Sequence, residues 1–289
     1  MKLVVVFLFV LAVVLGTPLD LKELRTLTKD KEISEKESPS TIPLAPSLPQ
    51  NKAGYSFAVD ISTPAAVSNF QCLTSNGYQA VFIRVYSPTG SGTVDTAGIT
   101  SVVNAATAKI GAEVYVAPQT LGSKQGYQQF DETYTALTNR GVSLRTIWLQ
   151  VTSPVNWQSN QQSNINFITS FVQRALQYGV TPGIYTNSYD WQQITSSWSG
   201  LSSYGTVYLW YWHVLGQGGN GESSPDFSDF RSFGSWSVAS VKQFAQTENL
   251  CGLTVNRDVY PSNFKSHAVK AVSKDSKDKI QVGCVFSNC

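Results

Sequence analysis

The sequence contains few charged residues for its size. They make up 14% of its 289 residues, and the formal net charge is +2, whereas an average soluble protein has about 25% charged residues. A nucleic-acid-binding surface needs a basic stripe, and a disordered chain needs high charge with low hydrophobicity. Both classes are therefore excluded, and we expect no nucleic-acid partner.

Histidine is scarce as well. His213 and His267 are the only two, too few to support a histidine-ligated metal site or a Ser-His-Asp triad. The sequence has no HExxH, CxxC, GxSxG or P-loop motif. Gly216–Gly221 matches GxGxxG, but Glu-Ser-Ser-Pro follows it where a phosphate-binding helix would begin, so we interpret it as a flexible loop. We expect no metal ion and no cofactor.

Only one long apolar run is present, and it lies at the N-terminus. Leu3–Leu15 has 13 residues, fewer than the roughly 18 that a membrane-spanning helix needs. Lys2 precedes the run, and the small residue Gly16 ends it, which is the pattern of a secretory signal peptide over residues 1–16. We therefore expect no membrane span and a mature protein in an oxidising compartment.

Four cysteines allow three pairings. Cys72 and Cys251 lie in the central part of the chain, and Cys284 and Cys289 lie near its end. We favour the bonds 72–251 and 284–289.

Composition divides the chain into four parts. After the predicted signal, residues 17–53 combine a charged stretch with a segment, residues 38–50, that contains four prolines, which is typical of a solvated linker or arm. Residues 54–263 carry the apolar periodicity of a folded domain, and residues 264–289 form a basic, cysteine-containing tail. We expect a monomer.

Strand-like and helix-like runs alternate through the domain. The predicted helices are 65–76, 96–110, 125–140 and 163–178, each followed closely by glycine. The predicted strands are 55–62, 80–87, 113–118, 146–152, 182–187, 207–214, 241–246 and 253–259. Such alternation is typical of parallel strands with helical crossovers. The fold class is α/β: an irregular β/α barrel of eight strands, with its helices mainly in the first five units.

In such barrels, chemistry lies at the carboxyl ends of the strands. Polar and aromatic side chains occur at those positions here. They are Asp60, Arg84, Tyr86, Gln150, Thr152, Tyr185, Asn187, Trp210, Trp212, Asn256 and Asp258. Alternation along a strand places Trp210 and Trp212 on one face and Tyr211 on the other. The two tryptophans could equally form core packing or a platform on which a sugar stacks.

With these strands assigned, the sequence resembles glycoside hydrolase family 25, the Chalaropsis-type lysozymes, and most of all its branch in nematodes and amoebae. The similarity covers essentially all of residues 54–260 and rests on the order and spacing of several segments. They are FAVDIS (57–62), FQCLTSNGYQAVFIRVY (70–86), TVDTAGI (93–99), TIWLQVTSPVNW (146–157), GIYTNSYDWQQI (183–194), VYLWYWHV (207–214) and VKQFAQT…CGLTVNRDVY (241–260).

The resemblance implies a secreted peptidoglycan muramidase, and it also exposes a departure. The family's aspartate at the end of the first strand matches Asp60. Its Asp-x-Glu at the end of the fourth strand falls on Gln150-Val151-Thr152, and its last aspartate falls on Asn256. Glycosidases need an acid to protonate the leaving oxygen, and neither Gln150 nor Thr152 can supply one.

Two functions follow as alternatives. The first is a lysozyme-like protein of antibacterial defence or digestion that acts on peptidoglycan, secreted or in the lumen of lysosome-related granules, with weak or lost hydrolysis. It would bind glycan through Arg84, Tyr86, Tyr185, Asn187, Trp210 and Trp212. The second is an active, divergent muramidase in which Asp60 and Asp258 form a carboxylate pair, one raising the pKa of the other. A structural or storage role without ligand is a third reading.

The loop after strand 207–214 contains the acidic residues Glu222, Asp226 and Asp229. We interpret it as a solvated loop, rather than one whose acidic groups reach the cleft.

Overall fold

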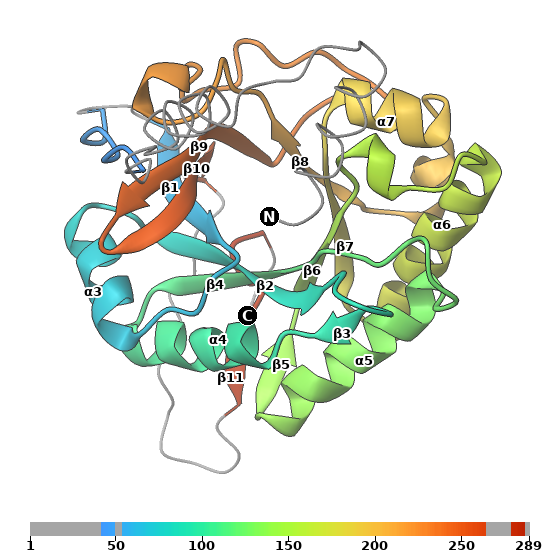
Figure 1. Ribbon diagram of the computed structural model, residues 1–289, viewed down its shortest axis with the longest axis horizontal. Helices are drawn as coiled ribbons and strands as arrows, with labels where there is room; N and C mark the ends of the chain where they lie inside the picture. The colour runs from blue at the N-terminus through green and yellow to red at the C-terminus, as the bar shows by residue number, and fades with distance from the viewer. Residues whose placement is uncertain (1–41, 50–53, 264–278, 287–289) are drawn as a thin grey trace, which may run out of the picture. The chain divides into compact units, whose positions relative to one another are not determined.

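Eight strands close into a barrel in the computed structural model, which describes residues 42–49, 54–263 and 279–286. Neighbouring strands follow the order β1-β10-β9-β8-β7-β6-β4-β2, and β1 pairs with β2 to close the ring (Figure 1). The barrel strands are β1 (Tyr55–Ile61), β2 (Ala80–Ser87), β4 (Gly111–Val116), β6 (Thr146–Gln150), β7 (Thr181–Thr186), β8 (Tyr208–Trp212), β9 (Val241–Leu250) and β10 (Leu253–Pro261). All eight were predicted from the sequence.

Alternation along these strands builds two packed layers. One set of side chains faces the barrel interior, where Phe82, Trp148 and Trp210 pack on one another. The other set faces outward against the helices, as Val81 and Ile147 do. Because successive side chains of a strand point to opposite sides, Trp210 lies inside while Tyr211 joins the outer layer, as the sequence predicts.

Among the described residues, five helices cover the outside of the ring (Figure 1). They are α3 (Val67–Ser75), α4 (Thr96–Ala108), α5 (Gly126–Asn139), α6 (Gln161–Gln177) and α7 (Ser188–Thr195). The first four match the predicted helices, and α7 was not predicted as one. The short strands β3 (Thr93–Val94) and β5 (Val142–Leu144) and three single-turn 3₁₀ helices lie in the connections: Pro154–Asn156, Gly200–Tyr204 and Gly219–Gly221.

The last strand differs from the prediction of an all-parallel barrel. β10 runs antiparallel to both β9 and β1. Only Cys251 and Gly252 separate β9 from β10, and a connection this short can form a hairpin but not a crossover. As a result, Asn256 pairs with Asp60, and Asp258 pairs with Ala58 one step deeper in the barrel.

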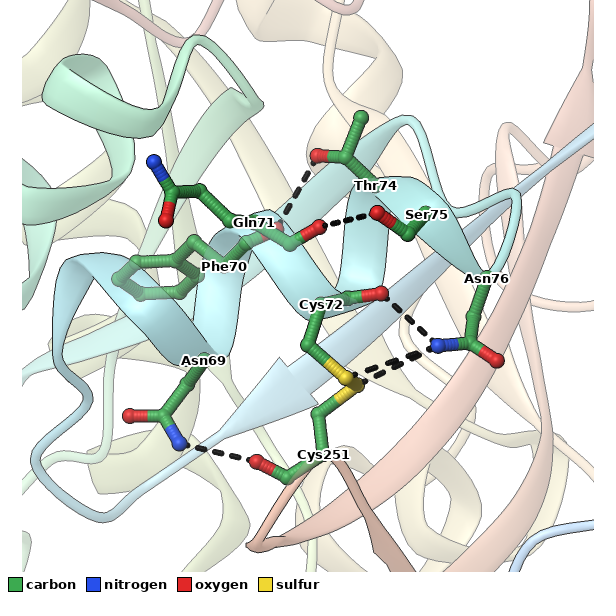
Figure 2. The surroundings of a disulfide bond; sticks show 8 residues. All are labelled: Asn69, Phe70, Gln71, Cys72, Thr74, Ser75, Asn76 and Cys251. Carbon is green, nitrogen blue, oxygen red and sulfur yellow. Dashed lines mark hydrogen bonds between the residues drawn. A yellow bond between two sulfur atoms is a disulfide. The ribbon is translucent and has the colours of Figure 1, made fainter.

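A disulfide bond anchors that hairpin. Cys72 of α3 and Cys251 of the hairpin turn are bonded, as predicted, across 179 residues of sequence. Figure 2 shows Asn76 Nδ2 donating toward both sulfur atoms and Asn69 Nδ2 donating to the Cys251 carbonyl at 2.9 Å. A cross-link over so long a loop stabilises a fold by about 2–5 kcal/mol. The second predicted bond involves Cys289, which lies outside the described residues.

The C-terminal tail closes the end of the barrel at which its parallel strands begin. β11 (Ile280–Val282) pairs with β5, and Val285 and Phe286 join the interior cluster. Gly283 has φ +82, and a Cβ there would lie 2.2 Å from the backbone nitrogen of Thr146, so only glycine fits this approach. The tail's last described residues are therefore part of the barrel core.

Residues 42–49 of the predicted arm lie along the β9–β10 hairpin. Asn249 donates its backbone N–H to the Pro43 carbonyl and accepts from Ala45. The predicted signal peptide, most of the predicted arm and residues 264–278 and 287–289 fall outside the described residues, so the four-part division of the chain stays a prediction. Within the described ranges, no helix combines the length and apolarity that crossing a membrane requires.

Candidate active site at the barrel mouth

Two adjoining clefts open at the carboxyl ends of the parallel strands, and each has a volume of about 320 Å³. The inner cleft includes Asp60, Arg84, Tyr115, Tyr185 and Asn256 in its wall. The outer cleft extends over Gln119, Leu121, Thr152, Ser153 and Trp157. Pro88, Ala117 and Gln150 line both, which makes Gln150 part of the boundary between them.

Asp60 is the only carboxylate among the residues that line the two clefts. Two side-chain amides hold it: Gln243 Nε2 donates to Oδ2 at 2.6 Å, and Asn256 Nδ2 donates to Oδ1 at 2.9 Å. Burial raises the pKa of Asp60 to about 6, although these hydrogen bonds favour its ionised form. Asp60 is thus a fixed hydrogen-bond acceptor whose charge changes in the mildly acidic range.

Asp258 lies directly beneath Asp60 in the barrel interior and is fully buried. Its Oδ1 accepts from Trp210 Nε1 at 2.9 Å, and no donor in the described part of the chain reaches Oδ2. Burial raises the pKa of Asp258 well above its ordinary value, and the neighbouring charge of Asp60 raises it further. Because a charge on Asp60 disfavours a second charge on Asp258, the ionisation of each carboxyl group depends on the other.

Gln150 and Thr152 stand in the cleft wall where the sequence comparison places them. Gln150 ends β6 and lines both clefts, and Thr152 lines the outer one. Gln150 Nε2 donates to Thr152 Oγ1 at 2.9 Å, so one hydrogen bond joins the two side chains. Neither group can ionise in the range where a glycosidase acid works.

A bulge in β2 separates the two candidates Arg84 and Tyr86. Arg84 pairs with Tyr115 and Tyr86 with the next residue, Val116, so that one extra β2 residue is inserted. A bulge of this kind re-aims the side chains that follow it. Arg84 therefore faces the inner cleft, whereas Tyr86 turns into the outer layer, where its hydroxyl donates to Glu132 at 2.8 Å. Tyr86 lines neither cleft.

Of the remaining candidates, only Tyr185 lines a cleft. Its ring stacks on the fully buried Trp210 at 4.1 Å between centroids, so Trp210 supports the floor from below. Trp212 is half-buried and donates its indole N–H to Asp190 at 3.0 Å. The Asn187 side chain caps α7 by accepting from the Asp190 N–H at 2.7 Å.

Two positioning residues were not singled out from the sequence. Gln243 donates to Asp60 and accepts from the Tyr185 hydroxyl at 2.9 Å, linking the floor to the stacked ring. Asp190 is buried, accepts from the Trp212 indole N–H and from the Ser153 backbone, and lines neither cleft. The sequence signals that could have found them were an acidic residue in the first turn of α7, Asp190, and a glutamine at an interior position of β9, Gln243.

The acidic residues of the β8–β9 loop bind groups within the loop or on the neighbouring strands β9 and β10. Glu222 forms an ion pair with the buried Arg257, and Asp229 binds Lys242 at 2.7 Å and the His213 ring. Asp226 accepts from Ser224 and Ser228 within the loop. None of the three lines a cleft. In the described ranges, no group of three or more histidine, cysteine or acidic residues could hold a metal ion.

Comparisons with known proteins find relatives over most of the chain. The family model described as Lysozyme-like protein 1 matches residues 51–244. Lysozyme-like protein 1 of Caenorhabditis elegans is 56% identical over 216 residues, which cover 75% of this chain and 72% of that protein. Probable GH family 25 lysozyme 2 of Dictyostelium discoideum is 35% identical over 205 residues, 70% of this chain and 90% of that protein.

Solved structures share the fold at lower identity. The muramidase from Trichobolus zukalii has a TM-score of 0.57 and 20% identity, and the match covers 74% of this chain and 98% of that one. The alignment of whole folds, together with the identity to the nematode and amoeba proteins, leaves one conclusion. The chain belongs to the lysozyme-like family within glycoside hydrolase family 25.

Proposed function

We propose that this protein binds peptidoglycan at the barrel mouth and hydrolyses it weakly or not at all. The observation that carries the proposal is the pair Gln150 and Thr152. Both line the clefts, and they stand where the family resemblance implies an Asp-x-Glu. The clefts, the fixed acceptor Asp60 and the cationic Arg84 still offer polar contacts to a glycan.

The chemistry of glycoside hydrolysis explains why this substitution matters. Cleavage needs a carboxylic acid that protonates the leaving oxygen, with a second carboxylate on the opposite side of the bond. A positioned general acid typically contributes about 10²–10⁴-fold to the rate. Here a neutral amide and a hydroxyl, joined by one hydrogen bond, occupy the wall. The glycan can be bound without an efficient route to cleavage.

The biological setting of the proposal is antibacterial defence or digestion. The N-terminal sequence has the pattern of a secretory signal, and the named relatives are lysozymes and lysozyme-like proteins. We place the mature protein outside the cell or in the lumen of lysosome-related granules, as a monomer without a cofactor.

A second candidate function, an active divergent muramidase, is favoured by the contact of Asp60 with Asp258. Burial and the neighbouring charge of Asp60 raise the pKa of Asp258 well above its ordinary value, and a protonated carboxyl is the acid that the mechanism needs. Two features weigh against it. Asp258 is fully buried, and the two groups touch, whereas glycosidase carboxylates are about 5 Å or more apart so that the sugar fits between them.

Purified Gram-positive cell walls distinguish the two functions. The protein is sedimented with the walls in a pulldown, and the turbidity of a matched suspension is followed over a broad pH range. We expect pulldown without loss of turbidity. Lysis by the wild type that disappears in both Asp60→Asn and Asp258→Asn would establish the muramidase instead. Failure of both pulldown and lysis would reject peptidoglycan as the ligand.

A further inference from the structure

Arg84 is the only cationic side chain among the residues that line the two clefts. It lies at the end of β2 just before the bulge, and its side chain is 27% exposed. The other charged residue in these walls is Asp60, on the neighbouring strand β1. The floor of the inner cleft therefore presents one anionic acceptor and one cationic donor side by side.

The guanidinium is held in one orientation before any ligand arrives. Nε and Nη2 both donate to Asp95 Oδ2, at 3.1 and 2.9 Å. Asp95 is fixed in turn, because its Oδ1 accepts from Gly98 N–H at the start of α4. A Cβ at Gly98 would lie 1.9 Å from the Arg84 carbonyl, so this helix start packs directly on the Arg84 backbone. A donor fixed in this way loses little side-chain entropy on binding.

The remaining nitrogen of the fork is available to a ligand. Nη1 donates to no protein group in the described ranges, while the other two nitrogens are engaged with Asp95. Arginine favours planar anions such as carboxylates, and charge-assisted hydrogen bonds of this kind are stronger than neutral ones. Asp60 has the complementary role of acceptor. Its carboxylate is held by two amides and can accept hydrogen bonds from hydroxyl or amide groups of a ligand.

From this arrangement we propose that Arg84 recognises a carboxylate of the bound glycan, so that the protein prefers acidic over neutral hexosamine polymers. The inference rests on the proposed function, since it assigns the specificity of the same clefts. Peptidoglycan carries free carboxylates on its stem peptides and on those muramyl groups that bear no stem peptide, and neutralising them removes the partner of Nη1. The carboxylate replaces water at Nη1 while the sugar's hydroxyl and amide groups donate to Asp60.

The test compares two forms of one polymer. Peptidoglycan is used as purified and after its carboxylates have been converted to neutral amides with a carbodiimide and methylamine. Dissociation constants are measured for the wild type, for Arg84→Met and for the control Lys124→Met. Lys124 has a similar exposure, 26%, and is also paired with a carboxylate, Glu132, but it lines neither cleft.

We expect the wild type to bind the native polymer about tenfold more tightly than the amidated one, the effect of one charge-assisted hydrogen bond. Arg84→Met binds both forms with the affinity that the wild type has for the amidated form, and Lys124→Met behaves as the wild type. Equal affinity of the wild type for the two forms overturns the inference and leaves the proposed function standing. Binding of neither form overturns both. Equal losses of Arg84→Met on the two polymers assign Arg84 to structure and also overturn the inference.

Discussion

Each end of the barrel interior holds a buried carboxyl group, and the two ends differ in what covers it. At the mouth, Asp60 is fixed by two amides and lines the inner cleft. At the opposite end, Glu113 accepts from Trp148 Nε1 and from the Val285 N–H, both at 2.9 Å, and the tail covers it completely. Burial raises the pKa of Asp60 to about 6 and that of Glu113 to about 8.

The comparison teaches that a raised pKa does not by itself mark a functional group. Glu113 has the larger shift, yet it has no opening through which a ligand could reach it. It anchors the tail by accepting from that segment's backbone. Asp60 has the smaller shift and faces a cleft. Access decides which carboxyl serves binding and which serves the fold.

Removing the tail's aromatic side chain should have the largest effect. Phe286 packs on Trp148, Tyr208 and Tyr260 at the closed end. We expect Phe286→Ala to lower the free energy of unfolding by about 3–5 kcal/mol, the usual cost of an aromatic cavity in a core. Denaturant unfolding measures it. Val155→Ala, at an 88% exposed position, serves as the control. A loss for Phe286→Ala no greater than that of the control would show that the tail is not part of the core.

The closed end should also make stability fall as pH rises. The folded pKa of Glu113 is about 8, above its ordinary 4.5, so the folded protein keeps a proton that the unfolded chain releases. The contribution of Glu113 to the free energy of unfolding is complete below its ordinary pKa of 4.5 and is lost as pH rises to its folded pKa of about 8. Unfolding free energies measured from about pH 5 to about pH 8 should decline. They should decline less in Glu113→Gln, which cannot titrate. Equal slopes in the two proteins would contradict this.

The open end should show a smaller effect, on binding. Asp60 accepts hydrogen bonds from a glycan best when it is ionised, and its pKa is about 6. We therefore expect retention on cell walls to weaken by a few-fold as pH falls through that value. Asp60→Asn should bind less tightly at neutral pH and lose this pH dependence. An unchanged pH profile in the variant would assign the dependence to another group.

Much of the fold was predictable because short apolar, strand-like runs alternate with runs of helical periodicity along the chain. The ends of the predicted strands located Asp60, Gln150 and Thr152, and all three line the clefts at the barrel mouth. The bulge that turns Tyr86 outward was not predictable, because it depends on how β2 pairs with β4 rather than on any local residue pattern. The antiparallel direction of β10 was not predicted either, because it follows from the two-residue hairpin turn between β9 and β10.

Other features lacked a signal of their own. Val285 and Phe286 are a two-residue apolar run in a basic tail, and only their packing in the barrel shows that they belong to the core. Gln243 is a neutral amide, a residue type that composition and charge do not single out, although its hydrogen bond orients Asp60. The proximity of Asp60 and Asp258 could be hypothesised from closure of the barrel, and the structure brings the two together.

The central claim is that the cleft lacks a proton donor at Gln150 and Thr152. The most direct measurement is the release of reducing sugar ends from purified peptidoglycan by the wild type and by the double variant Gln150→Asp, Thr152→Glu. The account predicts binding with little or no release by the wild type, and release raised by at least about tenfold in the double variant. Rapid release by the wild type, unchanged in the double variant, would contradict it.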